Sequence, residues 1–220
     1  MHYPDMRASG HALPRSWRLC IPAGIYGLYL CLLYWLLPSQ DFFVFLGLAV
    51  TYLLPPAGKE SVIPLGIVLG EAWWLVALTC ALLDIVCALF VVWNFDLLLS
   101  APLIGPVIRE CAGKGKEWIA AHHWLARMSY AGLFLFVLFP LQGSGGINAT
   151  IIGRMLGMGV IPVVFCITAG SVLGCVSIAM GAAYLNSALA SGGTLILAVP
   201  AAVALAGSVL FLLRRQAEKA

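Results

Sequence analysis

Long apolar runs constrain this chain more than any other feature of its sequence. The runs at residues 19–37, 72–98, 160–185 and 195–213 are each near or above the roughly 20 residues that a helix needs to cross a bilayer. Across all 220 residues, 62% are hydrophobic and 10% are charged, whereas a soluble domain is about half apolar and a quarter charged. Backbone in lipid must satisfy its own hydrogen bonds, so the chain is predicted to be an all-α polytopic membrane protein with about four full transmembrane helices.

Four other apolar segments are too short to cross the membrane, and they form two pairs. These segments are residues 42–54, 61–70, 130–139 and 147–157. A helix of 13 residues, the length of the first segment, reaches about 20 Å, whereas the hydrocarbon core is about 30 Å thick. Each pair is therefore predicted to be a re-entrant helical hairpin, entering and leaving on one side. The predicted hairpin-breaking residues are Pro55, Pro56, Gly58, Pro64, Pro140, Gly143, Gly145 and Gly146.

The two hairpin sequences resemble each other. When LLPPAGKESVIPLGIVLG (53–70) is aligned with LFPLQGSGGINATIIGRMLG (138–157), Pro55 matches Pro140. A two-residue gap then brings Leu69-Gly70 onto Leu156-Gly157. Each block follows a short apolar segment and precedes a long one. Paired interrupted segments in two halves of a chain are typical of a transporter built as an inverted repeat.

The positions of the basic residues predict the orientation. All 12 Lys and Arg residues except Lys59 and Arg154 lie in residues 1–18, 99–128 and 187–220. The positive-inside rule places these three segments in the cytoplasm. Both termini are then cytoplasmic, the protein is a multi-pass protein of the cytoplasmic (plasma) membrane, and the hairpins enter from opposite faces.

This topology divides the chain into five parts. They are a cytoplasmic tail (1–18), the first span with the first hairpin repeat (19–98), a cytoplasmic linker (99–128), the second hairpin repeat (129–186), and the last span with a basic tail (187–220). The linker is amphipathic from Lys116 onward, which predicts one interfacial helix lying on the membrane. A stripe of small residues in the long run that follows the second hairpin, which includes Gly170 and Gly174, predicts close helix packing.

Four charged residues fall at bilayer depth: Lys59, Glu60, Asp84 and Arg154. A charge there costs about 2.5–3.5 kcal/mol even on a lenient scale, and it marks a functional site by default. Glu60, beside the first hairpin tip, is predicted to bind protons or cations and to couple transport to protons. A salt bridge or a helix cap is the alternative for Glu60.

The other three charges have open alternatives. Asp84 could be a second carboxylate on a proton path, the partner of Arg154, or a buried interhelical hydrogen-bonding group. Arg154 could bind an anionic headgroup, pair with a carboxylate or snorkel to the interface. Lys59 or Arg154 could also draw a lipid phosphate along a groove.

Polar side chains of the second tip form another candidate group. Gln142, Ser144 and Asn148 could present amides and hydroxyls to a substrate or ion, or they could serve only as turn residues. The sequence shows no nucleophile–base or metal-ligand constellation, so we expect no enzyme, no cofactor and no metal. The expected partners are membrane lipids, protons and a small hydrophobic or amphipathic substrate or phospholipid. We expect no nucleic acid, and a homodimer is possible.

The two tip motifs resemble a known family. GKESVIPLGIVLG is similar to the first motif of the small multidrug export protein family, in which an acidic residue precedes I-P-L-G-I-x-x-G. FPLQGSGGINATIIGRMLG resembles its second motif and is similar to archaeal members. That family is grouped with the DedA (VTT-domain) membrane proteins. The resemblance implies two re-entrant hairpins in inverted repeat, with a hairpin acid at Glu60 and an arginine at Arg154 acting in proton-dependent transport.

Together, the residues and the resemblance predict an integral membrane secondary transporter. We expect proton-coupled export or translocation of a hydrophobic or amphipathic substrate. A lipid or lipid-carrier flippase or scramblase is the first alternative, because related proteins are implicated in lipid-carrier recycling and lipid scrambling. A non-transporting membrane scaffold is the second.

Overall fold

A computed structural model describes residues 14–54, 57–95, 123–140 and 144–190, and its regular elements there are all α-helices. The helices are α1 (Arg15–Leu36), α2 (Ser39–Leu53), α3 (Lys59–Val68), α4 (Trp73–Trp93), α7 (His123–Leu138), α8 (Gly146–Met155) and α9 (Val160–Ala190). The all-α prediction is confirmed for this part of the chain. The predicted hairpin residues Pro55, Pro56 and Gly143, and the candidate Gln142, lie outside the described residues.

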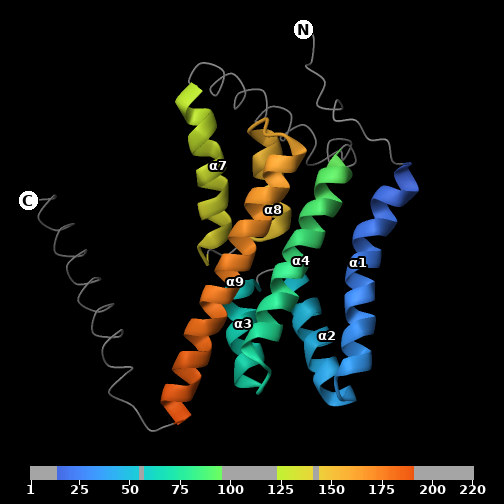
Figure 1. Cartoon of the computed structure of the whole chain (residues 1–220), viewed down its shortest axis with the longest axis vertical. Helices are drawn as coiled ribbons and strands as arrows, with labels where there is room; N and C mark the ends of the chain where they lie inside the picture. Colours follow the sequence, from blue (N-terminus) through green and yellow to red (C-terminus); the bar gives the residue numbers. More distant parts are fainter. Residues whose placement is uncertain (1–13, 55–56, 96–122, 141–143, 191–220) are drawn as a thin grey trace, which may run out of the picture.

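Three long helices form the frame of the molecule. Within the described ranges, α1, α4 and α9 are the helices that are long and apolar enough to cross a membrane. Figure 1 shows α4 beside α9 at the centre, with α1 on the other side of α4, and the residue contacts agree. Three of the four predicted spans thus correspond to long apolar helices. The fourth, residues 195–213, lies outside the described residues.

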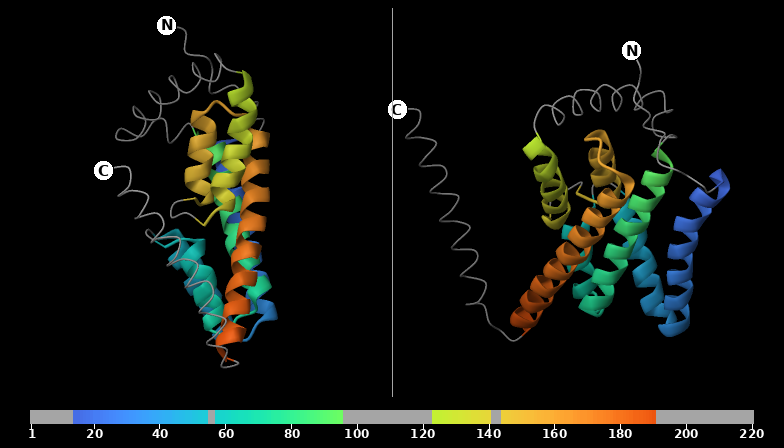
Figure 2. Two further views of the ribbon diagram at one scale, coloured as in Figure 1. Left: turned by 90° about the vertical axis from the view of Figure 1, so that its left-hand side faces the viewer. Right: turned by 45° about the horizontal axis from the view of Figure 1, so that its top comes forward.

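The shorter helices form two pairs at opposite ends of this frame. Figures 1 and 2 show α2 and α3 at one end and α7 and α8 at the other. Among them, α3 and α8 have 10 residues each and α7, the longest, has 16. At 1.5 Å per residue even α7 reaches only about 24 Å, so no helix of either pair matches the full hydrocarbon thickness.

The predicted interfacial helix and the short apolar segment after it are not separate helices where the structure describes them. Residues 123–128, its C-terminal part, form the start of α7 and continue unbroken to Leu138. No proline or glycine occurs between residues 123 and 131, so nothing interrupts the helical hydrogen bonds there. The rest of the predicted interfacial helix, residues 116–122, lies outside the described residues.

The two 10-residue helices end in the same way. Gly70 after α3 and Gly157 after α8 have φ of +95° and +76°, a conformation that other residues rarely adopt. The N–H of Glu71 donates to the carbonyl of Gly66 (3.1 Å), and the N–H of Met158 donates to that of Gly153 (3.0 Å). These are Schellman ends, which reverse the chain into the long helix that follows. The match of Gly70 with Gly157 in the sequence therefore has a structural cause.

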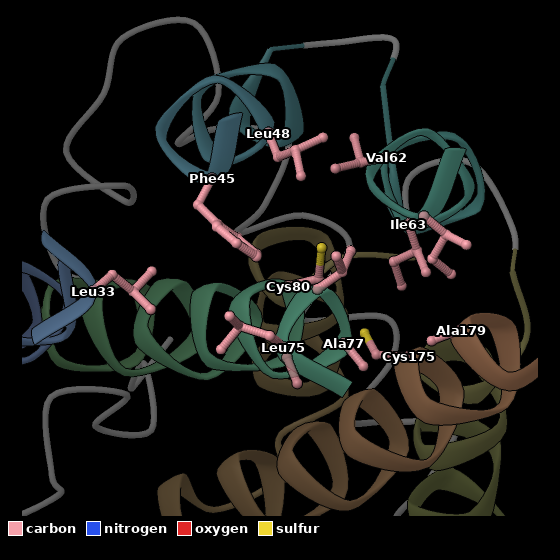
Figure 3. Close-up of a cluster of buried hydrophobic side chains, with 13 residues drawn as sticks. Leu33, Phe45, Leu48, Val62, Ile63, Leu75, Ala77, Cys80, Cys175 and Ala179 are labelled. Atoms are coloured by element: carbon pink, nitrogen blue, oxygen red, sulfur yellow. The ribbon is translucent and has the colours of Figure 1, made fainter. Parts of the chain in front are cut away.

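Each pair has its own hydrophobic cluster. The first cluster, drawn in Figure 3, joins α2, α3 and the first half of α4 to Cys175 and Ala179 of α9. The second joins α7, α8 and the second half of α4 to Val163 and Ile167 of α9. Because α4 and α9 contribute to both clusters, these two helices connect the halves of the molecule.

Glycines allow the closest helix contacts. A Cβ at Gly66 would lie 3.0 Å from Val76, and one at Gly153 would lie 2.8 Å from Val163, so each short helix approaches the long helix that follows it closely. In α9, a Cβ at Gly170 or at Gly174 would lie 2.8 Å from a carbonyl oxygen of α7. This confirms the predicted packing role of those two residues.

Candidate transport site

A buried carboxylate lies where the two halves meet. Asp84 of α4 is 1% exposed. Its Oδ1 accepts a hydrogen bond from the Tyr52 hydroxyl of α2 and one from the backbone N–H of Gly146 in α8, both 2.8 Å long. Its Oδ2 accepts from the Ser171 hydroxyl of α9 at 2.8 Å. We call Asp84, Tyr52, Gly146 and Ser171 the Asp84 junction.

The carboxylate occupies the N-terminal end of α8. Gly146 is the first residue of that helix, and its N–H has no partner within the helix. An anion at this position is also favoured by the partial positive charge of the helix N-terminus. Asp84 of the long helix α4 therefore caps α8, one of the second pair of short helices.

A glycine is required at position 146 because α8 approaches the backbone of α4 closely there. A Cβ there would overlap the backbone carbonyl oxygen of Asp84, whereas one at Gly145, the preceding residue, would lie 3.4 Å from Oδ1. The sequence predicted both glycines as helix breakers. The structure shows that Gly145 does precede the first helical residue, and that Gly146 lies inside α8, where its missing side chain lets α8 contact α4.

Lys59 binds the C-terminal end of α7, the other helix of this pair. It is the first residue of α3 and is 1% exposed, and its Nζ donates to the carbonyl oxygen of Val137 in α7. Val137 lies in the last turn of α7, where carbonyls lack helical partners and a cation is favoured. A lysine thus holds the C-terminus of α7 while Asp84 holds the N-terminus of α8.

Arg154 lies away from this junction. Its Nη1 donates to the Met158 carbonyl at 3.0 Å, and its guanidinium lies 5.5 Å from the centre of the Phe95 ring. The hydrogen bonds of Asp84 go to Tyr52, Gly146 and Ser171. Of the alternatives for Asp84, the structure therefore shows the buried interhelical hydrogen-bonding group and not the partner of Arg154.

Unlike Lys59 and Asp84, Glu60 is not fully buried. It is half-buried and lines a pocket of about 650 Å³ between the first hairpin tip and Pro140, at the end of α7. The other lining residues are Thr51, Ala57, Ser61, Val62 and Leu65. The carboxylate folds back over Gly58, since a Cβ on that glycine would lie 2.5 Å from Oε1.

The first turn of α3 is capped by Ser61. Its hydroxyl accepts from the N–H of Gly58 at 3.2 Å, as a capping residue does. Glu60 is an acidic residue in the same turn, which the helix dipole favours. Glu60 can therefore help to cap α3 and line the pocket at the same time.

The polar residues of the second tip are spread out. Ser144 is buried and donates to the Phe139 carbonyl at 3.1 Å, which is turn chemistry, while Asn148 is exposed. Pro64 lies inside α3 and does not interrupt that helix. The structure therefore brings Lys59 and Asp84 together at the second hairpin, places Glu60 on a pocket, and leaves Arg154 and Asn148 elsewhere.

Sequence reasoning missed Tyr52 and Ser171. A signal for Ser171 exists, because the spacing that matches Gly70 with Gly157 is 87 residues, and the same spacing matches Asp84 with Ser171. Tyr52 has a weaker signal, since it lies just before the first hairpin tip. Neither hydroxyl stands out in the sequence, because the carboxylate that it binds is far away along the chain.

These features define a class of protein: a helical membrane protein in which buried charges join two sets of short apolar helices. Comparison with known families is more specific. The family model described as putative small multi-drug export protein matches residues 60–177, more than half of the 220 residues. The chain belongs to this family, as the two tip motifs indicated. No match was found among curated proteins or among solved structures.

The matched residues include Glu60, Asp84, Gly146 and Ser171. The family description and the apolar helices together indicate a membrane-embedded transporter, and the description indicates export and not an enzymatic reaction.

Proposed function

We propose that this protein is a secondary transporter that exports a hydrophobic or amphipathic substrate across the cytoplasmic membrane in exchange for protons. One observation carries the proposal: the carboxylate of Glu60 lies on a pocket between the first hairpin tip and the end of α7. A carboxylate on an otherwise mainly apolar pocket can hold either a proton or an organic cation. Competition between a proton and the substrate for the Glu60 carboxylate would couple the proton flux to the substrate flux.

The arrangement of the helices supports this mechanism. We propose that the two pairs of short helices are re-entrant hairpins that enter from opposite membrane faces, in an inverted repeat of the kind the DedA resemblance implies. The matching Schellman ends and the 87-residue spacing support the repeat. Transporters of this design bind substrate near mid-membrane, where interrupted helices meet.

The charges at the second hairpin would have a positioning role. We propose that Lys59 and Asp84 hold the second hairpin against the first half while Glu60 exchanges its ligand. A lipid phosphate is a poor candidate for Lys59, because the amine is buried and bonded to Val137. The substrate class that best fits Glu60 is therefore an amphipathic cation.

Transport by purified protein in liposomes tests the proposal. We expect ethidium, a fluorescent amphipathic cation, to move when a pH gradient is applied. Glu60→Gln keeps the size of the side chain but cannot release a proton, so it should reduce the flux to that of protein-free liposomes. Glu71→Gln is the matched control, since Glu71 lies beyond the opposite end of α3 and does not line the pocket.

The outcomes of this experiment separate the three functions. If Glu60→Gln transports as fast as the unaltered protein, Glu60 does not couple the fluxes. Movement of a labelled phospholipid without any gradient would instead support a flippase or scramblase. No flux of either probe would favour a scaffold.

A further inference from the structure

A second hollow shares no lining residue with the Glu60 pocket. It has a volume of about 360 Å³ and runs between α1 and α4. On α1 it is lined by Pro22, Tyr26 and Leu30, which lie four residues apart. On α4 the lining extends from Leu83 to Phe90. Side chains four residues apart share one helix face, so the lining forms a groove parallel to the helix axes.

The length and chemistry of the groove fit hydrocarbon. Eight residues separate Pro22 from Leu30, which is about 12 Å of helix, and one leaflet contributes about 15 Å to the hydrocarbon core. No charged residue lines the groove. It opens outward, because Phe90 on its wall is 41% exposed. In a membrane that opening faces lipid.

The shallow end of the groove has a positive charge. Arg18 precedes Pro22 by four residues, so it continues the same face of α1 toward the helix N-terminus. The backbone carbonyl of Arg18 accepts from Asn94 at the end of α4 (3.1 Å), which ties α1 to α4 at this level. Trp17 beside it is 59% exposed, as an aromatic residue at the membrane interface would be.

The deep end of the groove meets the Asp84 junction. Leu53 follows Tyr52, Leu83 precedes Asp84, and Ile147 follows Gly146, and all three line the groove. An occupant of the groove would therefore press against three of the helices that the junction joins.

We propose that this groove binds one acyl chain of an anionic phospholipid from the leaflet at the N-terminal end of α1. The phosphate lies at Arg18, the chain follows the α1–α4 face inward, and its end packs on Leu53 and Ile147 beside the junction. This site is separate from the Glu60 pocket and does not depend on the proposed transport function.

Two glycines of α1 provide a matched test. Gly27 lines the groove and Gly24 does not, and a Cβ at either would meet no atom within 4 Å. Both Gly27→Leu and Gly24→Leu should therefore fold, but only Gly27→Leu fills the groove. The probe is phosphatidylglycerol with a diazirine on its acyl chain, present at low fraction in phosphatidylcholine vesicles that contain the full chain.

After irradiation, labelled peptides are located by mass spectrometry. We expect labelling on the groove-lining residues of α1 and α4, such as Pro22, Tyr26, Leu30 and Phe90, and about tenfold less in Gly27→Leu, a change that corresponds to about 1.4 kcal/mol. Gly24→Leu should label like the unaltered protein. Arg18→Gln should reduce labelling by the phosphatidylglycerol probe but not by a diazirine fatty alcohol, which has no phosphate.

Three results would overturn the proposal. Labelling spread evenly around α1, including the outward-facing Leu28, would mean ordinary lipid contact. Equal labelling of the two glycine variants would mean that the chain lies elsewhere. Equal labelling by phosphatidylglycerol and the fatty alcohol, with no effect of Arg18→Gln, would mean that the occupant is not an anionic lipid but another hydrocarbon, such as a substrate tail.

Discussion

At the scale of single residues, two buried charges have complementary roles. Asp84 binds the N-terminal end of α8, and Lys59 binds the C-terminal end of α7. Each charge has the sign that the helix dipole favours at that position. Both are fully desolvated, so their hydrogen bonds must offset a large cost of burial. Loss of these hydrogen bonds is therefore expected to destabilise the fold.

Removal of the Asp84 carboxylate should destabilise the protein strongly. Asp84→Ala leaves the Gly146 N–H and two hydroxyls without their acceptor, and each buried donor left unsatisfied costs about 1–3 kcal/mol. Asp84→Asn retains one carbonyl oxygen, so its loss should be smaller, about 1.5–3 kcal/mol. Thermal unfolding of the purified variants in detergent measures both, with Ser177→Ala on the exposed side of α9 as the control. If Asp84→Ala unfolds at the same temperature as the unaltered protein, the junction does not stabilise the fold.

At the scale of elements, glycines mark where the two 10-residue helices begin and end. α3 and α8 start after an extended residue at Gly58 and Gly145 and stop at a left-handed glycine. Between those points each helix packs closely on the next long helix through Gly66 or Gly153. In both short helices, one glycine therefore ends the helix and another, four residues earlier, brings it close to its neighbour.

Adjacent glycines at the start of α8 should respond differently to alanine. At Gly146 the added methyl group overlaps the Asp84 carbonyl, so α8 must move away from α4, and overpacking of this kind costs about 1–3 kcal/mol or more. At Gly145 the methyl group lies 3.4 Å from Oδ1 and φ is −69°, which alanine tolerates. We expect Gly146→Ala to reduce the yield of folded protein by size-exclusion chromatography and Gly145→Ala to leave it nearly unchanged. Equal yields would contradict the close contact between α8 and α4.

Sequence patterns predicted the elements better than they predicted the contacts. Apolar length identified α1, α4 and α9, and the breaks near residues 55 and 140 separated the short helices, because both signals are local. The partners of Asp84 are 32 to 87 residues away in the chain, and nothing local marks a serine or a glycine as a carboxylate's partner. The roles of Lys59 and Gly146 depend on how the halves pack, so they became visible only in three dimensions.

At the scale of the whole molecule, the two halves differ in one chemical respect. The 87-residue spacing pairs Asp84 with Ser171 and Lys59 with Gly146, so the first half supplies both charges and the second half supplies neutral partners. A perfectly repeated site would place two carboxylates side by side, which like-charge repulsion disfavours. The asymmetry leaves a single carboxylate at the centre, accepting hydrogen bonds from both halves.

The proposed inverted repeat predicts on which side of the membrane each pair of short helices ends. The turn between α3 and α4 should be outside the cell, and the turn between α8 and α9 should be in the cytoplasm. Ala72→Cys and Gly159→Cys test this, because both residues are exposed and lie in those turns. In a background in which the seven native cysteines are replaced by serine or alanine, a membrane-impermeant maleimide added to intact cells should label Ala72→Cys alone. Opening the cells should make Gly159→Cys reactive as well. If both positions react, or neither reacts, in intact cells while both react in detergent, the two turns share one face, and the halves cannot be related by inversion across the membrane.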